Sequence, residues 1–233
     1  MAFRFRQFIV EDDHSTMRVG TDAMLLGAWA DPENARHILD LGTGCGVLAL
    51  MMAQKSTAIV KAVDQDAESV TQAGSNFRTS PWRDRLTAIC TTAETYAENN
   101  EGGFDFIISN PPFFTDSLKS PSAKRNMARH ADASSRATLL SSIARLLKAD
   151  GRLAMVIPAE GFGDFMRLSC TAGIHPTRVR KVRSSREKEP VRVLGTFRKS
   201  AAIVREEEDL IIFEAPGKFT REYLEITSAF HRF

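Results

Sequence analysis

The stretch that decides the fold reads "HILDLGTGCG" and covers residues 37–46. An apolar run of strand length ends at Asp40, and three glycines follow at alternate positions, Gly42, Gly44 and Gly46. Residues 46–55 then read as a helix rich in apolar side chains. A glycine turn between a strand and a helix lets the backbone approach a ligand closely. The pattern predicts the first strand and helix of an α/β fold, with a ligand site at the turn.

The rest of the chain repeats this alternation of short apolar runs and longer helical segments. Such an alternation is typical of a mostly parallel sheet with helices on both faces. We expect strands at residues 37–41, 58–64, 86–90, 104–109 and 152–158, and helices at 46–55, 67–77, 134–147 and 161–173, with Asp150 and Gly151 ending the third of these helices. Later strands around 177–183, 192–204 and 209–214 would complete a sheet of about seven. Residues 115–133 are polar and predict a loop.

The composition limits the classes of protein to consider. The 233 residues are 43% hydrophobic and 26% charged, with no run of about 18 apolar residues that could cross a bilayer. The N-terminus lacks the apolar core of a secretion signal, so we expect a cytoplasmic protein without a membrane partner. Cys45, Cys90 and Cys170 are far apart, which argues against a disulfide framework and a zinc site. We expect all three to be small buried side chains, and we expect no bound metal.

The glycine turn disfavours one common class of ligand and resembles the site of another. A dinucleotide fingerprint would place a third glycine or an alanine where this chain has Val47. The turn resembles motif I of the class I S-adenosylmethionine-dependent methyltransferases. The resemblance implies a class I, Rossmann-like fold in which the amino-acid part of S-adenosylmethionine is held by Asp40, Gly42, Gly44 and Gly46.

Two further strand ends carry residues suited to the same cofactor. Ligands of open α/β sheets bind beyond the carboxyl ends of the strands, so Asp64 can accept hydrogen bonds from a ribose diol. Asp66 suits the N-cap of the helix that follows. By the same resemblance, Ala93 and Glu94, after the third strand, would lie beside the adenine of the cofactor.

The sequence "SNPPFF" at residues 109–114 ends the fourth predicted strand, because proline has no amide hydrogen to give a sheet. An Asn-Pro-Pro-aromatic sequence at this place resembles motif IV of methyltransferases that modify an exocyclic amine of adenine or guanine, or the amide of glutamine. Such an amine is a poor nucleophile until acceptors hold its hydrogens, and the Asn110 side-chain oxygen and the Pro111 carbonyl would do so. Asn110 would also border the cofactor. Pro112 would keep the turn rigid and Phe113 would stack on the base, with no need for a metal or a general base.

Segments outside this core narrow the resemblance. "MRVGTDAMLLGAW" at 17–29, "ARH" at 128–130 and a G-x-L-x-x-V-x-P strand at 151–158 are similar to segments of the bacterial tRNA1(Val) (adenine-37-N6)-methyltransferases, over about residues 5–213. The chain departs from that family at Asp64, where members often have Glu. The resemblance implies a cofactor pocket bordered by Gly20, Thr21 and Asp22, a place near the substrate for Arg18, and a role in contacting RNA or ordering the loop for Arg129 and His130.

Charge is unevenly spread along the chain. The net charge is only +2, yet residues 178–199 contain nine Lys or Arg against two Glu. A basic block of this kind indicates a surface for a polyanion, and the alternative is a solvated face. An anticodon loop offers an unpaired adenine that is readily splayed out. We expect the phosphates of this RNA to contact Arg180, Lys181, Arg183 and Arg198.

We therefore expect one methyltransferase domain over residues 1–233, with an N-terminal cap segment at 1–36, a cofactor-binding core at 37–158 and an RNA-facing part at 159–233. A monomer or a weak dimer is expected. The predicted reaction is methyl transfer from S-adenosylmethionine to N6 of adenine 37 in tRNA1(Val). Two alternatives stay open: an amino-methyltransferase with another target, such as guanine N2 of ribosomal RNA, and a catalytically silent module that binds S-adenosylmethionine or RNA.

Overall fold

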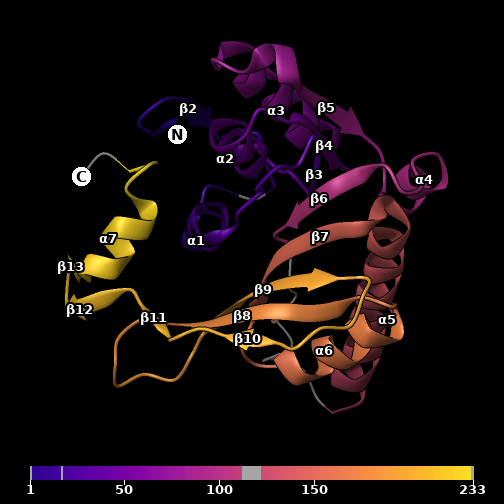
Figure 1. Cartoon of the computed structure of the whole chain (residues 1–233), viewed down its shortest axis with the longest axis vertical. Coiled ribbons are helices and arrows are strands. Elements are labelled where there is room, and N and C mark those ends of the chain that lie inside the picture. The colour runs from indigo at the N-terminus through magenta and orange to yellow at the C-terminus, as the bar shows by residue number, and fades with distance from the viewer. Residues whose placement is uncertain (1, 17, 112–121, 232–233) are drawn as a thin grey trace.

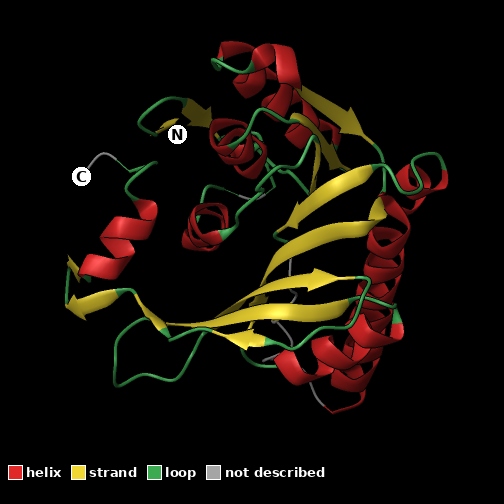
Figure 2. Ribbon diagram, viewed as in Figure 1, coloured by secondary structure: helices red, strands yellow, loops and turns green. Residues whose placement is uncertain are grey.

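The centre of the protein is one nine-stranded sheet, seen in Figures 1 and 2. The computed structural model describes residues 2–16, 18–111 and 122–231, with the helical backbone alone for 122–133. All the main strands run parallel except β9, which is antiparallel to both of its neighbours, so the other carboxyl ends meet at one edge. In spatial order the main strands are β8 (His175–Arg183), β9 (Arg192–Arg198), β7 (Leu147–Pro158), β6 (Phe104–Ser109), β3 (His37–Leu41), β4 (Ile59–Asp64) and β5 (Leu86–Cys90).

The mostly parallel α/β sheet predicted from the apolar runs is therefore present. Each central strand is buried on both faces, as β3 illustrates: Ile38 packs into one core and Leu39 into the other, both with no exposed surface. Two short strands at the edge pair in parallel with β8. They are β10 (Arg205–Glu206), which was not predicted, and β11 (Leu210–Ile211), which lies within the strand predicted at 209–214.

Helices cover both faces of the sheet (Figure 2). One core lies under α1 (Thr21–Trp29), α2 (Val47–Lys55) and α3 (Ala67–Thr79). The other lies under α4 (Ala93–Glu98), α5 (Ser122–Leu146) and α6 (Phe162–Thr171). Helix α3 begins where the sequence predicted, because the Asp66 side chain caps it by accepting a hydrogen bond from the Ser69 amide at 2.8 Å.

The structure corrects the prediction for the segment between β6 and β7. Helix α5 already begins at Ser122, so most of the predicted loop at 115–133 is helical, and its residues 115–121 lie outside the described part. The helix ends at Leu146, and Asp150 and Gly151 lie inside β7. Leu147 is fully buried and pairs with Phe104, and the register then shifts, so the four residues 148–151 form a bulge.

Several short elements near the chain ends were not predicted. They are the hairpin of β1 (Ala2–Arg4) and β2 (Ile9–Glu11), the 3-10 turn η1 (Arg83–Arg85), the hairpin of β12 (Phe213–Ala215) and β13 (Lys218–Phe219), and α7 (Arg221–Thr227). Figure 1 shows the two ends of the chain close together. The Arg6 amide donates to the Phe230 carbonyl and the Arg6 Nε to the His231 carbonyl, each at 2.9 Å.

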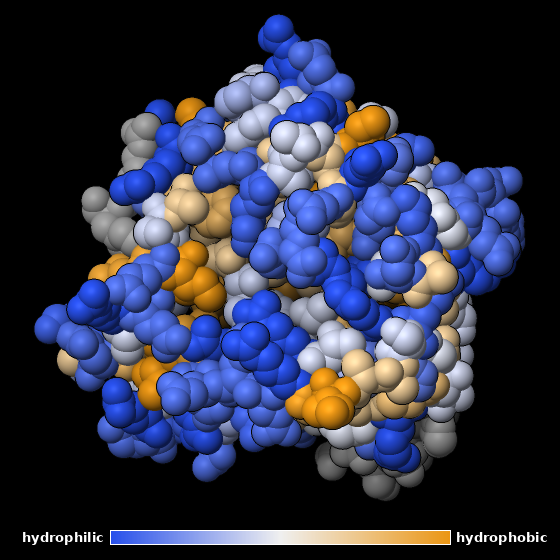
Figure 3. All heavy atoms as spheres, in the orientation of Figure 1, coloured by the Kyte–Doolittle hydropathy of each residue, from blue (hydrophilic) through white to orange (hydrophobic). Residues whose placement is uncertain are grey.

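The expectation that all three cysteines are buried is right for Cys45 and wrong for Cys90 and Cys170, which are exposed. Cys90 ends β5, a strand at the edge of the sheet with its last residue open to solvent. In the face shown in Figure 3, hydrophilic residues predominate and hydrophobic ones gather in small separate groups. Within the described residues, no helix combines the length and the apolar character that a membrane span requires.

Candidate active site

Asp40 lies inside the glycine turn and holds its shape. The side chain is fully buried, and its Oδ2 accepts hydrogen bonds from the Thr43 hydroxyl at 2.6 Å and from the Ala49 amide at 3.0 Å. Burial raises the pKa of Asp40 to about 7, and these two hydrogen bonds oppose that rise. The carboxyl group therefore connects the turn to the first part of α2 from within and is not among the residues that line the pocket described below.

The three glycines of the turn serve different needs. All have positive φ, +74° at Gly42, +53° at Gly44 and +86° at Gly46, a region that side-chain-bearing residues rarely adopt. A Cβ at Gly46 would lie 2.5 Å from the ring of Phe77 on α3, so this glycine is required for packing. A Cβ at Gly42 would meet nothing within 4 Å, and both Gly42 and Gly44 line a pocket.

This pocket has a volume of ≈ 510 Å³ and lies beyond the carboxyl ends of the parallel strands. It is the place where open α/β sheets bind their ligands. The pocket brings together residues predicted from four separate strand ends: Gly42 and Gly44 after β3, Asp64 at the end of β4, Ala93 and Glu94 after β5, and Pro111 after β6.

Asp64 connects two of these strand ends. Its Oδ2 accepts a hydrogen bond from the Gly44 amide at 2.8 Å, and its Oδ1 accepts one from the Asp66 amide at 3.0 Å. Ala93 and Glu94 form the first turn of α4, which Thr92 caps by accepting a hydrogen bond from the Thr95 amide at 3.2 Å. Because a carboxylate oxygen has two acceptor sites, Asp64 keeps capacity for a ligand that donates hydrogen bonds.

The end of β6 is fastened to the end of β3. The Ser109 hydroxyl, fully buried, donates to the Leu41 carbonyl at 2.7 Å, one residue before the glycine turn. Asn110 follows directly and is half-buried, and Pro111 lines the pocket together with Ser109. Pro112 and Phe113 lie outside the described residues, so their predicted roles stay predictions.

The N-terminal residues predicted to border the pocket lie at the start of α1. Gly20 is the N-cap of α1, and the following residues, Thr21 and Asp22, begin the helix. Asp22 Oδ2 pairs with Arg192 Nε at 2.8 Å, and Arg192 stands opposite Pro158 at the same edge of the sheet as the pocket. Gly20, Thr21 and Asp22 are not among the residues that line the pocket, which the N-terminal segment reaches through Thr16.

Acidic residues from the C-terminal part of the chain neutralise much of the basic block. Arg178 pairs with Glu207 at 2.7 Å and Arg183 with Asp209 at 2.5 Å, while Arg180 pairs with Glu222. These acids come from distant segments, so the local count of charges in the sequence did not include them. Of the three residues predicted at the centre of the block, Arg180, Lys181 and Arg183, Lys181 is the exposed one.

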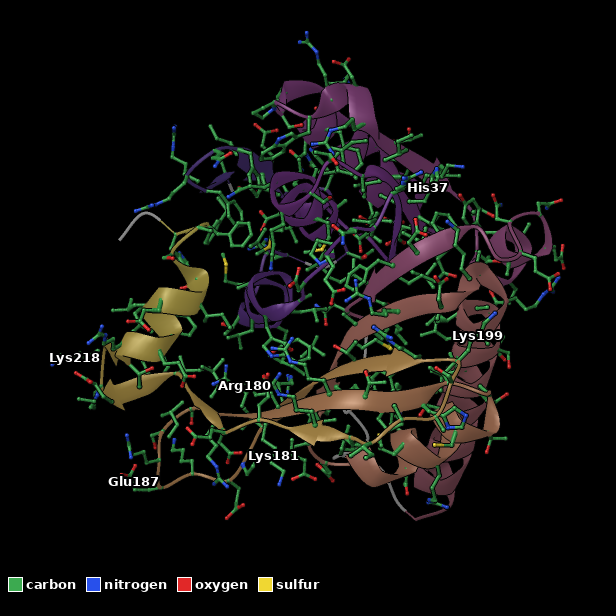
Figure 4. The ribbon with its side chains drawn as sticks, in the orientation of Figure 1. His37, Arg180, Lys181, Glu187, Lys199 and Lys218 are labelled. Carbon is green, nitrogen blue, oxygen red and sulfur yellow. The ribbon has the colours of Figure 1, made fainter. Side chains whose placement is uncertain are left out.

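The remaining predicted RNA contacts are spread over the molecule. Arg198 ends β9 opposite Arg152, at the edge of the sheet away from the pocket. In Figure 4 the neighbouring Lys199 lies far from Arg180 and Lys181. Arg18 is exposed and precedes α1. Arg129 and His130 belong to α5, where the structure describes the backbone alone.

Sequence reasoning missed several polar residues that line the pocket, among them Thr16 and Arg136. Arg136 lies three and four residues before Leu139 and Leu140, so a helical wheel would have placed it on the inner face of α5. Thr16 gave no local signal, because its position depends on contacts with a distant helix. Within the described part of the chain, no group of three or more His, Cys, Asp or Glu side chains could hold a metal ion.

Comparison with known proteins assigns the family. The model of the methyltransferase small domain matches residues 14–161. A tRNA1(Val) (adenine(37)-N6)-methyltransferase of Phocaeicola vulgatus is 42% identical over 98% of this chain and 97% of its own length. A protein of the same name from Dyadobacter fermentans is 41% identical over 92% of this chain and 90% of its own length.

Solved structures agree on the fold. A predicted O-methyltransferase from Agrobacterium tumefaciens superposes with a TM-score of 0.65 at 17% identity, covering 90% of this chain and 96% of its own. TYW2 from Pyrococcus horikoshii, solved in complex with MeSAdo, superposes with a TM-score of 0.59 at 15% identity, covering 85% of this chain and 71% of its own. The predicted class I methyltransferase fold is thus confirmed. With its relatives matched over nearly their whole length, this chain belongs to the methyltransferase small domain family and, within it, to the tRNA1(Val) (adenine(37)-N6)-methyltransferases.

Proposed function

We propose that this protein transfers a methyl group from S-adenosylmethionine to the N6 amine of adenine 37 in tRNA1(Val). The observation that carries the proposal is the meeting of the glycine turn, Asp64, Ser109 and Pro111 around one pocket, with Asn110 between the last two in the chain. Relatives that are 34 to 42% identical to this chain, over nearly its whole length, are named for this activity. The protein is an S-adenosylmethionine-dependent tRNA adenine-N6-methyltransferase.

The residues of the pocket fit the cofactor. The open side of Gly42 leaves room for the amino-acid part, and Gly44 brings backbone into the same wall. Asp64 has acceptor capacity for the ribose hydroxyls, and Ala93 and Glu94 would border the adenine. When bound, S-adenosylmethionine supplies an electrophilic methyl carbon on a sulfonium. The sequence-derived assignments for Asp40 and Gly46 become indirect in this proposal, because these residues shape the turn from inside the protein.

Asn110 and Pro111 would act on the target amine. The side-chain oxygen of Asn110 and the carbonyl of Pro111 each accept one hydrogen of the N6 amine, which directs the nitrogen lone pair away from the ring and toward the donor. Held in this way, the nitrogen would face the electrophilic methyl carbon that the bound cofactor would supply, and the proton lost on methylation would leave to water. Pro112 would stiffen the turn, and Phe113 would stack on the splayed adenine.

The tRNA would approach the carboxyl edge of the sheet. Arg18 and Lys181, both exposed, are our first candidates for phosphate contacts, and Arg180, Arg183, Arg198, Arg129 and His130 are candidates of second rank. Gly20, Thr21 and Asp22 would shape the wall between the cofactor and the RNA through the ion pair of Asp22 with Arg192. We further propose that the protein acts in the cytoplasm as a monomer or a weak dimer. Light scattering at several protein concentrations would measure the oligomeric state.

The test is methylation of unmodified tRNA1(Val) with tritiated S-adenosylmethionine, followed by nuclease digestion and mass spectrometry of the labelled nucleotide. We expect label at N6 of adenine 37 and none on a matched tRNA with guanine at that position. Label on guanine of ribosomal RNA would instead favour the guanine-N2 alternative. Binding of the cofactor without turnover on any RNA would favour the catalytically silent module.

A further inference from the structure

One face of helix α3 carries polar side chains where an apolar stripe would be expected. Ser69, Gln72 and Asn76 are spaced three and four residues apart and thus share this face. Their exposures are 0%, 5% and 3%. Burying polar groups is unfavourable unless they find hydrogen-bond partners, so the partners of these three residues indicate what the face is for.

All three bind the backbone of the segment that precedes α1, residues 11–16, which we call the strap. Asn76 accepts a hydrogen bond from the Glu11 amide at 3.0 Å and donates to the Glu11 carbonyl at 2.8 Å. Gln72 accepts one from the His14 amide at 3.3 Å. The Ser69 hydroxyl accepts one from the Thr16 amide at 3.2 Å and lies 3.4 Å from the Thr16 hydroxyl.

The same face of α3 also reaches the cofactor pocket at two places. The Asn76 amide nitrogen donates a second hydrogen bond, at 2.8 Å, to the carbonyl of Cys45 inside the glycine turn. At the other end, the Ser69 amide is bound by Asp66, which lines the pocket together with Asp64. One buried row of side chains therefore connects the strap to both the glycine turn and the Asp64 loop.

The strap is also closed on its far side. Asp12 Oδ2 accepts a hydrogen bond from the Val19 amide at 3.1 Å, which joins the strap to the residue just before the N-cap of α1. Thr16 ends the strap and lines the pocket, as Asp64, Gln65 and Asp66 do. The residue held by Ser69 therefore belongs to the same pocket as the carboxylate assigned to the ribose.

We propose that Ser69 and Asn76 are positioning residues for the cofactor, which hold the strap so that Thr16 completes the pocket wall and contacts the polar nucleoside part of S-adenosylmethionine. The proposal rests on the proposed function, because it takes the ligand of the pocket to be this cofactor. It adds an N-terminal contact to the set formed by the glycine turn, Asp64 and the residues after β5.

The test measures the dissociation constant of S-adenosylmethionine by calorimetry without tRNA, in wild type, Ser69→Ala, Asn76→Ala and Thr16→Val. Each variant removes hydrogen bonds while leaving the catalytic segment intact, and we expect each to weaken binding by about threefold to tenfold. In Ser69→Ala and Asn76→Ala, which do not alter the proposed cofactor contact itself, the maximal methylation rate at saturating cofactor should stay within about twofold of wild type. The control is Thr71→Ala, because the exposed Thr71 hydroxyl on the same helix donates to the Ala67 carbonyl of α3 at 2.8 Å, and we expect no change.

Hydrogen exchange without cofactor separates positioning from general stability. In Ser69→Ala and Asn76→Ala the amides of Glu11, His14 and Thr16 should exchange faster, while those of β3 and β6 keep their wild-type rates. Unchanged cofactor affinity despite faster exchange in the strap would overturn the proposal, and so would equal acceleration throughout the protein. Should Asn76→Ala not fold, Ser69→Ala decides alone, since it removes a single oxygen. A wild-type protein that binds no S-adenosylmethionine would instead overturn the proposed function.

Discussion

Asp64 accepts a hydrogen bond from the Gly44 amide at 2.8 Å, which joins the end of β4 to the glycine turn after β3. Two loops that a ligand must contact at once are thereby held in register by the carboxylate that we assign to the ribose. Pocket shape and cofactor recognition thus depend on the same side chain.

Replacing Asp64 with Ala should weaken binding of S-adenosylmethionine by at least about tenfold, because the variant loses both the charged acceptor and the link to Gly44. Calorimetry measures the affinity. Asp64→Glu is the matched control, since it keeps a charged acceptor on a longer side chain and should bind within a few-fold of wild type. Wild-type affinity in Asp64→Ala would contradict the assignment.

Asn110→Ala should reduce the maximal methylation rate by about a hundredfold or more, because the target amine loses one of its two acceptors. Cofactor affinity should be nearly unchanged, since Ser109 and Pro111 still line the pocket. Single-turnover rates with saturating tRNA and cofactor measure the effect. A variant as fast as wild type would refute the proposed role of the Asn110 oxygen.

Asp40 should make the free energy of unfolding fall as pH rises from about 4 to about 7. Burial raises the pKa of Asp40 from 3.8 to about 7, so in this range the folded protein binds a proton that the unfolded chain releases. The contribution is complete below pH 4 and lost above pH 7, with a size on the order of 4 kcal/mol at most. Urea unfolding of wild type and Asp40→Asn across this range isolates it. A difference between the two proteins that does not vary with pH would exclude Asp40 as the source.

The first and last glycines of the turn, Gly42 and Gly46, should differ in their response to substitution by alanine. Gly42→Ala and Gly46→Ala both place a side chain at positive φ, which costs about 1 kcal/mol or more. Gly46→Ala adds a clash with Phe77, because the new Cβ would lie 2.5 Å from the ring. This clash should lower the free energy of unfolding by a further amount of about 1 to 3 kcal/mol. Urea titration compares the stabilities of the two variants. Calorimetry should find that the main effect of Gly42→Ala is weaker binding of the cofactor. Equal stability of the two variants would contradict the packing role of Gly46.

Lys181→Ala should weaken tRNA binding and reduce its salt dependence by about one unit of log-log slope. Arg183→Ala should mainly lower stability, because Arg183 already pairs with Asp209. Filter binding from low to moderate salt measures the slope. The same measurement on Arg198→Ala tests the predicted phosphate contact of Arg198, which lies at the other edge of the sheet. An unchanged slope in Lys181→Ala would mean that the basic block is only a solvated face.

Features that depend on neighbours in the sequence were predictable. The central strands are continuous apolar runs buried on both faces, and the cap of α3 needs only Asp66 and the Ser69 amide three residues later. The ends of β3, β4, β5 and β6 converge because parallel strands share one edge. This rule predicts that Gly42, Asp64, Glu94 and Pro111 lie together, and all four line the pocket.

Features that depend on distant segments were not predictable. The positive charge of β8 is balanced by Glu207, Asp209 and Glu222, which follow it by tens of residues. Thr16 lines the pocket, and its amide is bound by Ser69, which lies 53 positions later in the chain. The early start of β7 likewise follows from the pairing of Leu147 with Phe104. The helical periodicity of the preceding residues did not predict this pairing.

The contact of Arg6 with His231 joins residues 225 positions apart. During synthesis on the ribosome, Arg6 emerges early yet cannot reach its final partner until the chain has been made through residue 231. The sheet and its helices can assemble in the meantime, so closure of the chain ends is a late event in folding. A circular permutant that links these ends and opens elsewhere would make that late encounter local.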